Sequence, residues 1–462
     1  MKIHESEIQN EANTSSANEA QTEGLVNDIT IMLESSKPPI SIEGSISVPN
    51  HLRKLNEEAF TPLLISIGPI HRSNEKLQTM KKYKVWSLDY FINKRTKVNL
   101  KDLVSAIREM EENIRCCYPE TASSSMSSND FVKMILEDAI FILEHFWRYL
   151  DTIRRTKSWK QDDSAIASWM YAFVRTDLVL LENQLPLFVL EKLFNLSFSN
   201  DSKPHSLIEL AFEFFTVVYN IQEMTFKDFK KCLDGGIGEE MEGGRNIHPE
   251  VKAEHLTDLI RAFHLSSPLP DRSFEVEKLL YTATQLHDAG VKFKVSSNKS
   301  LLGIKFDYEN GVLEIPSLNL YKETADLIPN LIALEQSRYS EKQYITDYFV
   351  ILGFLVNTTK DMDLLCENEI LVNYLGDSNT ATSVVNKLNT RILLGDMNTD
   401  YNRICKELNA FYKKSWHRWK ATLWHQYFST PWRAASTIAA VILLVLTLIQ
   451  TICSVIQIVP IV

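Results

Sequence analysis

The sequence predicts a mainly α-helical protein: a large helical body with a small antiparallel β-sheet, followed by one C-terminal transmembrane helix. Three observations support this fold class. Apolar residues recur at helical spacing along most of the chain, whereas strict alternation is confined to residues 291–321. The final stretch, 434–462, contains no charged side chain. The part that precedes it is long for a single core, so we expect one large domain with two lobes.

The N-terminal part is predicted to pass from a disordered tail into the body. Residues 1–41 are polar and acidic, which is typical of a disordered tail. The body then occupies residues 42–401. Its first elements are predicted to be short extended pieces at 45–49 and 64–67, followed by a long helix over 75–94.

A helix that begins near Phe131 is apolar over most of its surface, and its polar residues form one narrow stripe. They are Lys133, Glu137, Glu144 and Arg148, with Asp138 and His145 beside them. Such a stripe predicts an ion-pair row or a seam open to solvent. The alternative is that its carboxylates are catalytic.

A polar cluster is predicted where two apolar helices meet. Glu182, Asn183 and Gln184 separate the two runs, and Pro186 suits the first turn of the second helix. Polar groups buried between apolar helices need hydrogen-bond partners. We therefore expect a structural kink or cap network, with a ligand-facing cluster as the alternative. His71 is the titratable residue that we place with this cluster.

The second half of the body changes its pattern twice. Residues 234–250 are rich in glycine and acidic side chains, and no strand precedes them. They predict a flexible insertion and no nucleotide binding. A helix is predicted at 273–287, and the antiparallel sheet follows at 291–321 with a hairpin turn at Glu309-Asn310-Gly311. Helical spacing returns from Glu323.

The C-terminus predicts a membrane anchor. Residues 402–433 combine helical spacing with aromatic and basic side chains, which predicts a juxtamembrane amphipathic helix lying on the membrane surface. The alternative is that this helix packs on the body. Residues 434–459 predict the transmembrane helix, since roughly 20 apolar residues span a bilayer. The residues expected to fix the anchor are Trp416, Trp419, Trp424, Trp432, Arg433, Leu443, Leu444, Leu446 and Leu448.

The lipid bilayer is therefore one expected partner, and charge bias predicts the side on which the body lies. Basic residues precede the span and none follows it, which favours a cytosolic body. Five Asn-x-Ser/Thr sequons favour the opposite orientation; they begin at Asn13, Asn195, Asn200, Asn298 and Asn357. The net charge of −10 argues against a nucleic-acid partner.

The sequence contains none of the local motifs that mark common catalytic or metal sites. Its histidines are dispersed without zinc-ligand spacing, and no nucleophile elbow, phosphate loop or kinase motif set occurs. The six cysteines form no disulfide framework, which fits a reducing compartment. We therefore expect no enzyme activity, no cofactor and no metal.

Seven blocks, in order along the chain, resemble a known family. They are residues 48–71, 131–146, 177–194, 283–294, 311–336, 345–377 and 431–451. The chain resembles the land-plant proteins of unknown function numbered 247. It departs from them at one point, because Ile70, His71 and Arg72 stand where the family has an aromatic residue and two histidines. The family implies a plant membrane protein with one C-terminal span and no established catalytic activity, and some grass members are implicated in pollen–stigma self-incompatibility.

Together these features predict a membrane-anchored plant protein that recognises or scaffolds protein partners without enzyme activity. The resemblance extends this expectation to reproductive recognition. The alternative is a hydrolase or transferase with a dispersed active site. A concave pocket that holds His71 or Glu182, with a second titratable group within hydrogen-bond reach, would favour the enzyme.

Overall fold

A computed structural model describes residues 46–48, 50–54, 57–154, 168–198, 205–216, 226, 253–265, 269–297, 300–390, 392, 395–414 and 430–458. The predicted tail at 1–41 and the predicted insertion at 234–250 lie outside these residues. From Ile46 onward the chain forms one compact unit. It is mainly helical, with short strands in small sheets and one apolar helix at the C-terminal end, as the sequence predicts.

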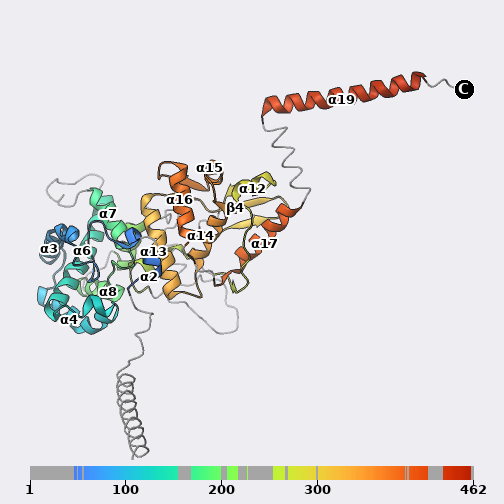
Figure 1. The fold of residues 1–462 in the computed structure, drawn as a ribbon. Helices are drawn as coiled ribbons and strands as arrows, with labels where there is room; N and C mark the ends of the chain where they lie inside the picture. Colours follow the sequence, from blue (N-terminus) through green and yellow to red (C-terminus); the bar gives the residue numbers. More distant parts are fainter. Residues whose placement is uncertain are drawn as a thin grey trace, which may run out of the picture. The chain divides into compact units, whose positions relative to one another are not determined.

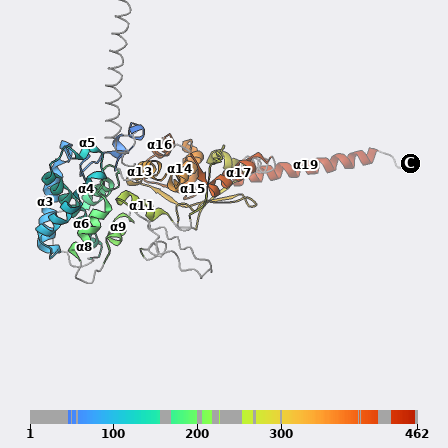
Figure 2. The ribbon, with the colours of Figure 1, turned by 90° about the horizontal axis from the view of Figure 1, so that it is seen from below.

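The described residues before 265 form helices around one central helix. These are α2 (Asn50–Arg53), η1 (Glu57–Phe60), η2 (Glu75–Met80), α3 (Lys81–Tyr90), η3 (Phe91–Arg95), α4 (Leu100–Cys116), α5 (Glu120–Ser123), α6 (Ser128–Arg154), α7 (Ser168–Leu178), α8 (Leu187–Ser197), α9 (Leu207–Thr216) and α11 (Leu256–His264). Figures 1 and 2 show α3, α4 and α8 gathered around α6, which also contacts α9. The predicted helix over 75–94 is present as η2, α3 and η3, the last being a turn of π-helix.

The remaining body mixes helices with short strands. Its elements are β1 (Arg272–Ser273), α12 (Ala283–Asp288), β2 (Lys292–Val295), β3 (Lys305–Asp307), β4 (Val312–Ile315), β5 (Leu318–Leu320), α13 (Lys322–Arg338), α14 (Tyr344–Leu355), α15 (Thr359–Glu367), β6 (Leu371–Asn373), α16 (Ser378–Asn389), β7 (Met397–Asn398) and α17 (Thr399–Lys413). Helix α13 joins the two groups, because it contacts α7 and α11 on one side and α14 and α16 on the other (Figure 1).

The predicted antiparallel sheet at 291–321 is only partly correct. The hairpin is present: β3 and β4 are antiparallel, and Gly311 adopts a positive φ of 63° in their turn. However, β2 pairs with β4 in parallel, and β5 leaves this sheet to pair in parallel with β6. Pro316 follows β4 directly and has no N–H to donate, which ends the ladder there.

The predicted helix at 273–287 is wrong over most of its length. Only α12, from Ala283 to Asp288, is helical. Before it the backbone lies alongside α17, where Asn402 and Asn409 accept hydrogen bonds from the N–H groups of Glu277 and Leu280 at 2.8 and 3.0 Å. Amide side chains of α17 thus satisfy donors that a helix would have used internally.

The predicted juxtamembrane helix at 402–433 is corrected at its N-terminal end. Residues 402–413 belong to α17, whose apolar face packs on the body through the buried side chains of Ile404, Leu408 and Phe411. This is the alternative arrangement, because body contacts already cover the face that would have met lipid. Trp416, Trp419 and Trp424 lie outside the described residues.

The last helix, α19 (Pro431–Ile458), begins slightly before the predicted span. Residues Trp432–Ile452 are long and apolar enough to cross a membrane, and none of the most apolar part of this stretch is buried against other described residues. Trp432 and the predicted anchor leucines are all exposed; the leucines are Leu443, Leu444, Leu446 and Leu448. Arg433, also predicted in the anchor, lies in its first turn.

Candidate functional site

Side chains take the place of a strand ladder along the predicted extended pieces at 45–49 and 64–67. Their described residues form no strand and join none of the sheets found in the described chain. The N–H of Val48 bonds to a Glu182 carboxylate oxygen at 3.0 Å, and that of Ile67 bonds to the Asn183 side chain at 2.6 Å. The predicted polar cluster therefore holds these backbone segments in place.

Asp177, at the end of α7, anchors the same segment and was not predicted from the sequence. Its two carboxylate oxygens accept hydrogen bonds from the N–H groups of Leu63, Leu64 and Ile65 at 2.8, 2.7 and 2.7 Å. Burial raises the pKa of Asp177 to about 6, and the three N–H donors oppose that rise. The signal in the sequence was a lone acid directly before an apolar run.

Asn183 and Gln184 are fully occupied by backbone groups. Asn183 also donates to the carbonyls of Ile65 and Asp177 at 3.0 and 2.9 Å. Gln184 donates to the carbonyls of Leu178 and Leu180, and its oxygen accepts from the N–H of Leu256 at the start of α11. Both side chains are buried, so these bonds meet the requirement that buried polar groups be paired.

Asn330 of α13 ties the second half of the body to this turn. Its oxygen accepts from the N–H of Leu181 at 2.8 Å, and its nitrogen donates to the carbonyls of Ala59 and Asp326 at 2.8 and 2.9 Å. Asp177, Asn183, Gln184 and Asn330 are hereafter called the turn hub. The hub is the structural network that the sequence predicted, enlarged by two residues from outside the predicted cluster.

Glu182 and His71 lie close together, as predicted. A third residue, Arg53, pairs with Glu182 and makes a catalytic role for the two unfavourable. Arg53 forms an ion pair with Glu182, and the Nε2 atom of His71 is 3.9 Å from the same carboxylate oxygen, beyond hydrogen-bond distance. Burial and the neighbouring Arg53 charge lower the pKa of His71 to about 4. His71 is therefore neutral near pH 7, and Arg53 already neutralises the Glu182 carboxylate.

The polar stripe on α6 is an ion-pair row. Arg95 and Arg148 both bond to Glu144, whose side chain is fully buried, at 3.1 and 2.8 Å. Lys84 pairs with Asp138, which also accepts from the N–H of Gly68 at 2.8 Å. Lys133 lies 3.9 Å from Glu137. His145 is enclosed by aromatic rings, and burial lowers its pKa to about 3.

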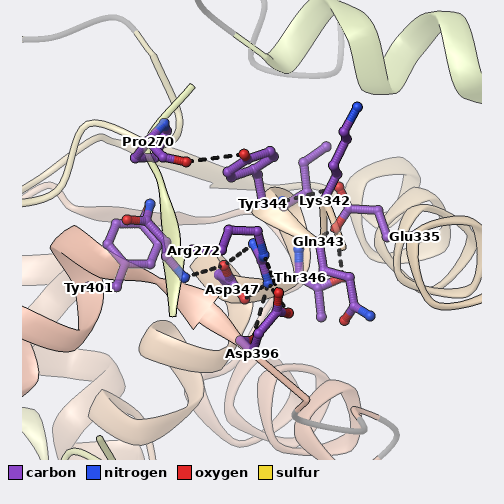
Figure 3. A network of polar contacts seen from close by, with 12 residues as sticks. Pro270, Arg272, Glu335, Lys342, Gln343, Tyr344, Thr346, Asp347, Asp396 and Tyr401 are labelled. Carbon is purple, nitrogen blue, oxygen red and sulfur yellow. Dashed lines mark hydrogen bonds and ion pairs between the residues drawn. The ribbon is translucent and has the colours of Figure 1, made fainter. Parts of the chain in front are cut away.

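A second buried network, which was not predicted from the sequence, lies in the other half of the body (Figure 3). Arg272 bonds to Asp347 at 2.7 Å and to Asp396 at 2.8 Å. Glu335 accepts from Arg261 at 2.8 Å and from the N–H and hydroxyl of Thr346 at 2.8 and 2.7 Å. Arg272, Glu335, Asp347 and Asp396 are hereafter called the Arg272 network.

Asp347 is the titratable residue of interest in this network. Burial raises its pKa to about 7, although the charge of Arg272 and the N–H of Asn398 at 3.0 Å both favour the ionised form. A carboxyl that titrates near neutrality is often catalytic, but it can also mark a structural ion pair. Here both oxygens already accept hydrogen bonds from Arg272, and one also accepts from Asn398.

Two of the surface pockets among the described residues lie away from His71 and Glu182, which line neither of them. One, of about 360 Å³, lies between α14, α16 and residues 278–282, with Phe354, Asn357 and Asn389 on its wall. The other, of about 90 Å³, is polar and is lined by Arg72, Gln78, Lys81, Lys84 and Glu137 among others. Within the described residues no group of three His, Cys, Asp or Glu side chains could hold a metal ion.

The chain is thus a helical body held together by buried polar networks and followed by one helix long enough and apolar enough to cross a membrane. It belongs to the family described as plant protein of unknown function, DUF247, whose model matches residues 46–446. The resemblance noted in the sequence is thereby confirmed.

Two proteins of Arabidopsis thaliana are similar to the chain. UPF0481 protein At3g47200 is 27% identical over 437 residues, which cover 87% of this chain and 84% of that protein. Putative UPF0481 protein At3g02645 is 22% identical over 482 aligned positions, covering 87% and 88%. No solved structure matches the chain.

Proposed function

We propose that this plant protein is a membrane-tethered recognition or scaffolding protein that acts through protein partners rather than through catalysis. The observation that carries the proposal is α19, which follows a folded body and has no charged side chain after Arg433. Leu443 and Leu444 are 64% and 69% exposed, whereas most of the large apolar side chains of the body are buried. A lipid bilayer is the environment that would cover such a helix.

The membrane tether is tested by alkaline carbonate extraction of membranes from plant cells that express the full chain. The wild-type chain should stay with the membranes. A Leu443→Lys, Leu444→Lys, Leu446→Lys variant should move to the soluble fraction, because each lysine at the centre of a span costs about 2.5–3.5 kcal/mol. The matched control is Leu63→Lys, at an exposed site on the body. Release of the wild-type chain would overturn the proposal.

The body is proposed to face the cytosol, since basic residues precede α19 and none follows it. Endoglycosidase treatment of the same membranes tests the orientation. No mobility shift is expected. A shift that disappears when Asn195, Asn298 and Asn357 are replaced by glutamine would place the body on the lumenal or extracellular side.

The role in binding proteins is supported by exposed aromatic side chains on α7. Trp169 is 56% exposed and Phe173 43% exposed, and their rings meet edge to face at 5.8 Å. Exposed tryptophan is enriched at the centres of protein interfaces. Cross-linking in membranes, with partners identified by mass spectrometry, should give defined partners that a Trp169→Ala, Phe173→Ala variant loses and a Leu63→Ala control keeps.

The arrangement around His71 also supports a role without catalysis. A hydrolase would need His71 or Glu182 to be free for substrate, whereas Arg53 occupies the space beside both. A His71→Gln variant should therefore keep the partner profile of the wild-type chain. An activity that the wild-type chain shows on an ester, peptide or glycoside panel and that this variant lacks would favour the hydrolase instead.

A further inference from the structure

The segment 273–281 and α17 lie side by side along the edge of the body. Asn402 and Asn409 bond to its backbone, and at the far end the ring of Tyr281 stacks on Tyr412 with centroids 3.6 Å apart. Glu275 is 3.6 Å from Lys406 of the helix. The two stretches thus lie in contact along the length of α17 and present neighbouring exposed side chains as far as Lys413; Lys278 and Leu280 also border the pocket beside α14 and α16.

This surface combines apolar and basic side chains. The ring of Phe274 is 91% exposed and Leu280 is 56% exposed. Lysines beside them are exposed too, although the whole chain carries a net charge of −10. We call this surface the α17 face; it consists of Phe274, Lys278, Leu280, Lys406, Lys413 and Lys414.

The chain between α17 and α19 limits how far this face can lie from the membrane. Only the sixteen residues 415–430 separate Lys414 from Pro431. Fully extended, they span at most about 60 Å, and as a helix about 24 Å. The end of α17 therefore lies within about 60 Å of the residue at which α19 begins, close enough for the α17 face to reach the membrane surface.

We propose that the α17 face rests on the membrane surface, with its lysines on anionic lipid headgroups and Phe274 and Leu280 in the interfacial layer. The proposal rests on the membrane tether proposed above. Aromatic and aliphatic side chains beside lysines are the composition of interfacial membrane contacts. Because Glu275 offsets part of the charge of Lys406, the selectivity for anionic lipid comes from Lys278, Lys413 and Lys414.

Photo-cross-linking of the full chain in nanodiscs tests the proposal. A diazirine amino acid is placed singly at Phe274, Leu280, Leu63 or Leu443, and lipid adducts are measured by mass spectrometry. The nanodiscs contain phosphatidylcholine with about 25% phosphatidylserine, or phosphatidylcholine alone. Positions 274 and 280 should form lipid adducts in the anionic discs, as position 443 does, whereas position 63 should not.

A charge-reversal variant separates surface attraction from mere proximity. Lys278→Glu, Lys413→Glu, Lys414→Glu should lower adduct yield at position 280 in anionic discs by roughly five-fold or more, since each lysine near an anionic surface contributes about that factor. The control Lys94→Glu, Lys101→Glu, Lys192→Glu makes the same change of net charge elsewhere and should leave the yield unchanged.

Two failures are distinguishable. Adducts at 443 with none at 274 or 280 above the level at 63 would overturn the α17 face while leaving the tether intact. Absence of adducts at 443 would overturn the tether, and the α17 face with it.

Discussion

The turn hub and the Arg272 network are both buried and polar, but they are built from different chemistry. The hub pairs side-chain amides and one carboxylate with backbone groups, as in the three bonds of Asn183. The Arg272 network pairs carboxylates with a guanidinium that reaches Asp347 and Asp396. The comparison shows two ways to hold together segments that lie far apart in the sequence.

The two designs differ in what happens when one partner is lost. Side-chain amides and backbone groups do not titrate. When one of them loses its hydrogen-bond partner, it therefore stays buried and unpaired at any pH. A buried carboxylate can take up a proton instead, and the pKa of Asp347 is already raised to about 7 by burial. Breaking the amide bonds of the hub should therefore be costly at every pH, although the hub's one carboxyl, Asp177, has its own pKa raised to about 6. Breaking the Arg272 network should be costly mainly above neutrality.

The largest expected effect comes from Asn183→Leu in the hub. Leucine fills a similar volume but leaves the Ile67 N–H and the carbonyls of Ile65 and Asp177 without partners. At about 1–3 kcal/mol per orphaned group, the free energy of unfolding should fall by roughly 3–9 kcal/mol. Urea denaturation of the full chain in detergent, followed by tryptophan fluorescence, measures this loss.

The control for this variant is Asn379→Leu, at an exposed asparagine, which should change the free energy of unfolding by less than about 0.5 kcal/mol. The loss in Asn183→Leu should be the same at pH 5.5 and pH 8, because no group with a changed pKa is removed. A loss below about 1 kcal/mol would show that water replaces the missing bonds and that the hub is not closed to solvent.

The next effect in size comes from Arg272→Met. It removes the cation shared by Asp347 and Asp396, and breaking a buried ion pair costs about 3–5 kcal/mol when the remaining charge stays ionised. Because Asp347 can remain protonated, we expect about 2–4 kcal/mol at pH 8 and a smaller loss at pH 5.5. The same denaturation series at the two pH values measures it, and a loss independent of pH would contradict the proposed contrast between the networks.

The distance along the chain between the members of a network decides how much of it can be predicted from the sequence. Glu182, Asn183 and Gln184 are adjacent, and Pro186 marks the helix start after them, so local rules predict a buried polar turn. Asn330 lies 149 positions from its partner Leu181, and nothing local in the sequence links them. The predicted cluster was therefore correct for the residues of the turn itself, but it lacked Asn330, which comes from the second half of the body.

The Arg272 network was missed for the same reason. Arg272 is 75 residues from Asp347 and 124 from Asp396, and one sequence carries no record of which distant side chains meet. The extended pieces at 45–49 and 64–67 failed in another way. They form no strand of a described sheet, because their N–H groups bond instead to side chains such as Asp177 and Asn183, which strand propensity cannot reveal.

A smaller effect, in pH dependence, is expected from Asp347→Asn. In the wild-type chain burial raises the pKa of Asp347 from 3.8 to about 7, so between these values the folded state holds a proton that the unfolded state releases. That residue makes the free energy of unfolding fall as pH rises, by up to about 1.4 kcal/mol per pH unit. The variant lacks this contribution, so its free energy of unfolding relative to wild type should increase from pH 4 to pH 7.

The reference for this slope is Asp363→Asn, at an exposed carboxyl on α15 that accepts a hydrogen bond from the Ser378 hydroxyl. Its difference from wild type should stay nearly constant over the same range. An equally flat difference for Asp347→Asn would mean that Arg272 keeps Asp347 ionised throughout, and the two networks would then respond alike to pH.

The smallest effect is expected from Lys133→Gln, at the exposed end of the α6 ion-pair row. Lys133 is 68% exposed and lies 3.9 Å from Glu137, so water and salt screen the pair, and such pairs contribute about 0–1 kcal/mol. Glu137 also lines the polar pocket with Arg72, Lys81 and Lys84, which remain near its charge when Lys133 is lost. The free energy of unfolding should thus fall by less than about 0.5 kcal/mol, and the change should shrink further at high salt. A loss of free energy of unfolding as large as that of Arg272→Met would contradict this expectation. It would mean that an exposed ion pair can contribute as much as a buried one, so burial could not explain the cost of breaking the Arg272 network.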